Sequence, residues 1–141
     1  MNAAVMKEMG TRLPEGMASQ REWVKCDENF QMKVLSVDEQ NHSVEVLVKI
    51  AAGYKSEKHR HTCETHAYVL QGSIVNHTTG CVFGVGDYCF QPVNDEHIEE
   101  FPEETVAYVS YRGESDKLVE FFDDEGNVCG EFKVSDFNAM I

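Results

Sequence analysis

Three histidines in two short segments constrain this chain most strongly. His59 and His61 are separated by one residue, and His97 follows in a later segment that begins at Gly86 and passes through Pro92. Side chains of a β-strand alternate between its two faces, so His59 and His61 should project from the same face. Imidazole is a good ligand for zinc, copper, iron and nickel. The three histidines therefore predict a transition-metal site with coordination positions left over for other ligands.

Alternating apolar residues indicate β-strands along most of the chain. Val44, Val46, Val48 and Ile50 recur strictly at every second position, and a polar turn at residues 38–41 precedes them. Further short apolar segments recur at intervals of about 8–12 residues, separated by Gly, Pro, Asn and Asp, which is typical of a sandwich or barrel. The pattern predicts an all-β fold that closes as a double-stranded β-helix, the jelly-roll barrel, with the site in its mouth.

The chain is expected to form one barrel domain with short extensions at both ends. Residues 1–20 predict an N-terminal arm or short helix, residues 21–134 the barrel, and residues 135–141 a C-terminal tail that forms a short helix. Residues 67–70 are apolar on both faces of their strand. We therefore expect this strand inside the closed barrel, with neither face in contact with water.

Charge and hydropathy exclude several classes of partner. The formal net charge is -13, from 25 acidic and 12 basic residues. This balance argues against binding to nucleic acid or to an anionic membrane surface. No apolar run approaches the roughly 20 residues that span a bilayer, and the first residues lack the pattern of a signal peptide. A cytoplasmic location is expected.

The two histidine segments resemble the two signature motifs of the cupin superfamily. GYKSEKHRHTCETHAYVLQG, residues 53–72, is similar to the first motif, and GDYCFQPVNDEH, residues 86–97, to the second. Within the cupins, HRHTCETHAYVLQG is most similar to two groups. One contains small single-domain dioxygenases that cleave dihydroxyacetophenones and acetylacetone, and the other contains the metal-binding domain of ChrR anti-sigma factors. The resemblance implies the RmlC-like jelly-roll fold that the strand pattern predicts.

The resemblance also implies a set of metal ligands. Cupins of the common type carry a glutamate separated from the second histidine by three or four residues, but Thr65 and His66 occupy those positions here, and Glu64 lies one position early. The implied site is therefore made of histidines alone, namely His59, His61 and His97, as in the acetylacetone-cleaving enzymes. Such a site would hold one transition metal, with Fe(II) expected first and Zn(II) or Ni(II) as alternatives.

Three further residues are candidates to complete or assist this site. Three roles remain open for His66: metal ligand, hydrogen-bond partner of a ligand or substrate, or ordinary packing. If the chain is an enzyme, His66 is the candidate catalytic proton shuttle. Glu64 and His77 are the other candidates for a fourth ligand or for a hydrogen bond to one.

Aromatic residues are the candidates for a substrate pocket. Aromatic side chains fill the interior of small barrels, and those near the mouth can line a ligand cavity. From the strands around the site we select Tyr68, Phe90 and Tyr108.

Two functions from different classes follow from the resemblance. The first is a non-haem Fe(II) dioxygenase that uses dioxygen to cleave a carbon–carbon bond in a small diketone or hydroxyketone. The second is a zinc-binding sensory cupin of the ChrR type without turnover. An open coordination position would favour the enzyme, and a closed one the sensor. Because cupins commonly cover their edge strands by pairing them, a homodimer formed through the N-terminal strands is also expected.

Overall fold

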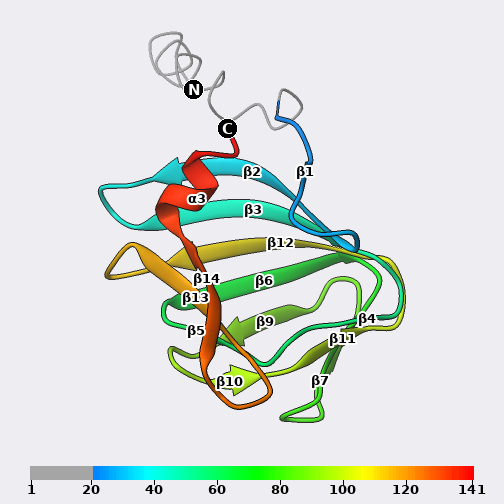
Figure 1. The fold of residues 1–141 in the computed structure, drawn as a ribbon. Coiled ribbons are helices and arrows are strands. Elements are labelled where there is room, and N and C mark those ends of the chain that lie inside the picture. Colours follow the sequence, from blue (N-terminus) through cyan, green and yellow to red (C-terminus); the bar gives the residue numbers. More distant parts are fainter. Residues whose placement is uncertain (1–20) are drawn as a thin grey trace, which may run out of the picture.

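The computed structural model describes residues 21–141, and this part of the chain folds into β-strands and one short helix (Figure 1). The N-terminal arm expected over residues 1–20 lies outside the described residues. The largest sheet has six strands in the order β1-β2-β3-β12-β6-β9. Their bounds are β1 Val24–Lys25, β2 Phe30–Asp38, β3 Ser43–Ile50, β12 Thr105–Arg112, β6 Glu64–Gln71 and β9 Tyr88–Gln91.

Two smaller sheets complete the barrel. One has the order β10-β5-β13-β14 and the other β4-β11-β7-β8. The first comprises β10 Glu96–His97, β5 His59–His61, β13 Lys117–Phe122 and β14 Val128–Lys133. The second comprises β4 Tyr54–Lys55, β11 Glu99–Phe101, β7 Ile74–Asn76 and β8 Val82–Phe83. All strand pairs are antiparallel, which confirms the all-β jelly-roll expectation.

The core lies between the inward faces of these sheets. On β3, Val44, Val46, Val48 and Ile50 are all buried, as their alternation predicts. β2 and β3 pair as the expected hairpin around the turn at residues 38–41. The large sheet therefore turns one apolar face toward the barrel interior, where the candidate site lies.

β6 does not have the environment expected for it. Ala67 and Val69 are buried, but Tyr68 is 43% exposed and Leu70 is 47% exposed. The outer face of β6 is therefore in contact with water, and the expectation of a strand covered on both faces is wrong. Tyr68 is the register partner of Tyr88 on the neighbouring strand β9, and both side chains are exposed.

The C-terminal helix α3, Val134–Asn138, lies beside β2 and β3 at one end of the barrel (Figure 1). Val134 and Phe137 are both 0% exposed. The Phe137 ring packs 5.6 Å from the rings of both Tyr111 and Phe132. The segment expected as a tail thus includes part of the core. Within residues 21–141, no helix has the length and apolar character needed to cross a membrane.

Candidate metal centre

The three histidines converge because of the pairing between β10 and β5. His97 on β10 is the register partner of His59 on β5, and His61 lies two residues further on the same face of β5. The ring of His97 lies 4.3 Å from that of His59 and 5.1 Å from that of His61, between ring centroids. All three side chains are buried. The predicted convergence is therefore confirmed, while metal ligation stays a prediction.

A fourth donor that sequence reasoning missed, Glu99 on β11, joins the histidines. Its Oε1 lies 3.3 Å from Nε2 of His59 and 3.4 Å from Nε2 of His97. The candidate ligand atoms of the four residues all lie within 4.8 Å of one another. The donor cluster therefore contains a carboxylate in addition to the three histidines that the resemblance implied. The signal was the one-residue spacing between His97 and Glu99, the same spacing that places His59 and His61 on one face.

Contacts at Nδ1 of His59 and His61 leave the Nε2 atoms of these two rings directed toward the cluster. His59 Nδ1 lies 2.9 Å from the backbone carbonyl of Glu57, to which it donates. His61 Nδ1 lies 2.9 Å from the Thr65 hydroxyl. Nε2 of His61 is buried and has no hydrogen-bond partner among the described residues, and Nε2 of His97 is buried and faces Glu99 Oε1 at 3.4 Å. Buried polar atoms are rarely left unpaired, so ring nitrogens in this arrangement fit a site that binds a metal ion through Nε2.

The electrostatics of the cluster favour the protonation states that a metal requires. Burial lowers the pKa of His61 well below its usual value, and nearby His59 and His97 lower it further. Burial alone would raise the pKa of Glu99, but its contacts with His59 and His97 outweigh burial and hold the pKa well below its usual range. The cluster therefore favours a neutral imidazole and an ionised carboxylate, the forms that coordinate metals.

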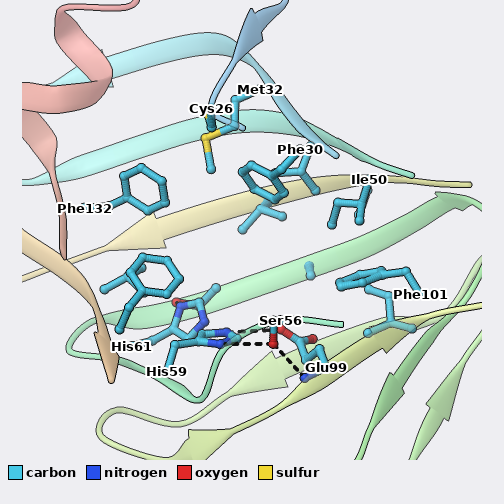
Figure 2. Close-up of a pocket in the computed structure, with 18 of the residues that line it drawn as sticks. Cys26, Phe30, Met32, Ile50, Ser56, His59, His61, Glu99, Phe101 and Phe132 are labelled. Atoms are coloured by element: carbon cyan, nitrogen blue, oxygen red, sulfur yellow. Dashed lines mark hydrogen bonds and ion pairs between the residues drawn. The ribbon is translucent and has the colours of Figure 1, made fainter. Parts of the chain in front are cut away.

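Three of the four donors, His59, His61 and Glu99, line one end of a cavity of about 300 Å³ inside the barrel. Figure 2 shows His59, His61 and Glu99 at one end of this space, with aromatic and aliphatic side chains around the rest. None of the described residues that line it is a lysine or an arginine. Its apolar walls include Phe30, Ile50, Phe101, Phe121 and Phe132.

The three residues proposed to complete the site lie elsewhere. His66 is on the outer face of β6, where it bonds to the Tyr88 hydroxyl and lies 3.2 Å from Glu64. His77 Nε2 lies 2.5 Å from Glu100 Oε2 at the surface. None of His66, Glu64 and His77 belongs to the donor cluster or lines the cavity. The structure therefore contradicts a direct role for His66 as proton shuttle in this cavity.

The aromatic residues proposed for the substrate pocket also lie outside the cavity. Tyr68 and Phe90 are 43% and 48% exposed, and the Tyr108 hydroxyl donates to Glu45. Each lies on a strand of the barrel wall, but its side chain is on the face of the strand that points away from the barrel interior. On β12 the inward position is Tyr111, whose ring stacks 5.8 Å from His61 and lines the cavity. The residues predicted to line the pocket point outward, and their immediate neighbours on the same strands point inward.

Comparison with known proteins identifies a family. The model of the ChrR cupin-like domain matches residues 16–116 of this chain. A search of curated proteins finds no match.

Several solved structures share the fold. A crystal structure of an RmlC-like cupin from Ralstonia eutropha JMP134 superposes with a TM-score of 0.75 at 18% identity, covering 83% of this chain and 76% of that one. An acetylacetone dioxygenase from Acinetobacter johnsonii superposes with a TM-score of 0.73 at 18% identity, covering 84% of this chain and 83% of that one. The structure of Rhodobacter sphaeroides SigE in complex with the anti-sigma ChrR superposes with a TM-score of 0.58 at 17% identity, covering 79% of this chain and 67% of the matched chain. At these identities the likeness concerns the fold.

Proposed function

The chain belongs to the family of ChrR cupin-like domains, and from the chemistry of its buried donors we propose that it is a metal-dependent dioxygenase. The proposed metal is Fe(II), and the proposed reaction is cleavage of a carbon–carbon bond in a small neutral diketone or hydroxyketone by dioxygen. The observation that carries the proposal is the position of the donor cluster at the end of a ligand-sized apolar cavity. A purely structural metal site needs no such cavity.

The size and lining of the cavity support a compact, uncharged substrate. A dry cavity of about 150 Å³ is known to hold benzene, and the cavity here is about 300 Å³. It can therefore take a molecule the size of one ring with a short side chain. The absence of lysine and arginine from its described lining leaves no cation to balance a carboxylate or phosphate. A neutral ketone satisfies both conditions.

The residues of the chain would hold the metal and exclude water from the reaction. His59, His61 and His97 offer neutral nitrogen ligands through Nε2, and Glu99 offers one carboxylate oxygen. Iron(II) held there would supply a Lewis acid for the enolate of the ketone and electrons for the activation of dioxygen. The surrounding Phe and Ile side chains keep the local dielectric low, which strengthens the interactions of the charged groups.

The proposal predicts oxygen consumption that depends on the histidine cluster. Protein reconstituted anaerobically with Fe(II) should consume dioxygen when acetylacetone or α-hydroxyacetophenone is added, and His97→Ala should lower this rate by at least about 100-fold. His77→Ala removes a histidine that lies outside the cluster, so its rate should equal that of the unchanged protein. An oxygen electrode gives the rates, and chromatography identifies the cleavage products. Equal rates in His97→Ala and the unchanged protein would contradict the proposal.

A zinc-binding sensory cupin is the second candidate. It is supported by the family match and by Glu99, since three histidines and one carboxylate can complete a closed tetrahedral zinc site. Tightly bound zinc, no oxygen consumption and no response of the metal to ketones would together favour this function over the first.

A further inference from the structure

Gln91 lies beside the donor cluster, although its sequence context did not mark it as a site residue. It is the last residue of β9, a strand on which Cys89 and Gln91 are buried and Tyr88 and Phe90 are exposed. Gln91 is 8% exposed and lines the cavity. A buried amide requires hydrogen-bond partners for both its nitrogen and its oxygen.

The amide of Gln91 has one of these partners and lacks the other. Its Nε2 donates to Oε2 of Glu99 over 3.4 Å. An ionised carboxylate can only accept hydrogen bonds, so this contact fixes which end of the amide faces Glu99. The amide oxygen, Oε1, is buried and has no hydrogen-bond partner among the described residues. A buried acceptor without a donor is costly to the protein unless a bound molecule supplies the donor.

Glu99 therefore connects Gln91 to the candidate metal ligands. One carboxylate oxygen, Oε1, faces Nε2 of His59 and Nε2 of His97, while the other is held by Gln91. Removing the Gln91 amide would free the carboxylate to rotate. A hydrogen bond of this kind to a metal-binding carboxylate commonly tunes its orientation and the affinity of the site.

We propose that Gln91 both positions Glu99 and selects ligands that carry a hydrogen-bond donor next to the group that the metal binds. Its Nε2 holds the carboxylate, and its Oε1 accepts from a hydroxyl or N–H of the ligand. The inference rests on the proposed function and sharpens it. A hydroxyketone offers such a hydroxyl, whereas the enolate of a plain diketone presents only acceptor oxygens to Oε1. Gln91 therefore favours the hydroxyketone.

The test compares two ligands that differ only in the donor. Affinities of α-hydroxyacetophenone and α-methoxyacetophenone are measured by calorimetry on the Zn(II)-loaded full chain, so the readout does not need turnover. The unchanged protein should bind the hydroxy compound about 3- to 10-fold more tightly, the effect of one neutral hydrogen bond. Gln91→Met, which keeps the length of the side chain and removes the acceptor, should abolish this preference.

The same variant tests the positioning role. Gln91→Met should lower the affinity for Zn(II) by about 10- to 100-fold, as expected when a hydrogen bond to a ligand is lost. Phe90→Met alters the adjacent residue on the exposed face of the same strand. It should change neither the metal affinity nor the ligand preference, and urea unfolding confirms that both variants are folded.

Two kinds of result would overturn the inference. One is a ligand preference that is absent in the unchanged protein or survives in Gln91→Met, including failure of both ketones to bind. The other is unaltered metal affinity in Gln91→Met. Oxygen consumption separates this failure from failure of the proposed function. If the unchanged protein consumes oxygen but Gln91→Met keeps the ligand preference, only the role of Gln91 is refuted. If the ligand preference is as predicted but the protein consumes no oxygen, only the dioxygenase function is refuted.

Discussion

Replacing His61 with alanine should lower the affinity for Fe(II) or Zn(II) by more than about 100-fold, because loss of a hydrogen bond to a ligand alone costs about 10- to 100-fold. His61 is 6% exposed, and its Nε2 is buried without a hydrogen-bond partner among the described residues. Its Nδ1 is already engaged by Thr65. The ring is thus oriented to offer one nitrogen to the cluster. Competition with a chromophoric chelator under anaerobic conditions measures the affinity.

His77→Ala is the matched control for this prediction. His77 pairs with Glu100 at the surface and lies outside the cluster, so its removal should leave metal affinity unchanged. Circular dichroism of both metal-free variants checks that they are folded. Equal loss of affinity in the two variants, or no loss in His61→Ala, would show that His61 is not a ligand.

Replacing Phe137 with alanine should destabilise the domain by about 3–5 kcal/mol, the usual cost of truncating a fully buried phenylalanine. Phe137 is 0% exposed and packs against Tyr111 and Phe132. Because Tyr111 stacks on His61, the cavity left by the truncation lies one side chain away from the candidate metal ligands. Urea unfolding of the metal-free protein measures the change in the free energy of unfolding.

Phe90→Ala provides a matched truncation at an exposed position. Phe90 is 48% exposed on the outer face of β9, so its loss should cost about 1 kcal/mol or less. If Phe137→Ala were no more destabilising than Phe90→Ala, α3 would not be part of the folded core.

The fold and three of the four donors could be predicted from the sequence because both depend on the period of a β-strand. Strict alternation marked β3, and the spacing of His59 and His61 fixed their common face. The position of His97 opposite His59 depends on the pairing of β10 with β5. That pairing joins segments far apart in the sequence, so the strand period alone could not predict it. The resemblance of residues 86–97 to the second cupin motif indicated that His97 joins the site.

Glu99 and the cavity wall could not be obtained in the same way. Common cupins carry the carboxylate after the second histidine, whereas here it comes from β11, the strand that follows His97. Which residues form the cavity wall depends on which face of β6, β9 and β12 points into the barrel. Tyr68 and Phe90 are as apolar as inward residues, so hydropathy alone could not tell the two faces apart. Small inward residues such as Ala67 and Ala107, which leave room for the cavity, were the better indicator.

The most direct test of the account is a titration of the metal-free protein with Co(II), followed by α-hydroxyacetophenone, under anaerobic conditions. Visible absorption reports both the amount of bound metal and a change in its coordination. We predict one Co(II) per chain, held by the cluster of His59, His61, His97 and Glu99, and a spectral change when the ketone is added. Absence of stoichiometric binding, or a bound metal whose spectrum no neutral ketone alters, would contradict a catalytic metal that faces an open cavity.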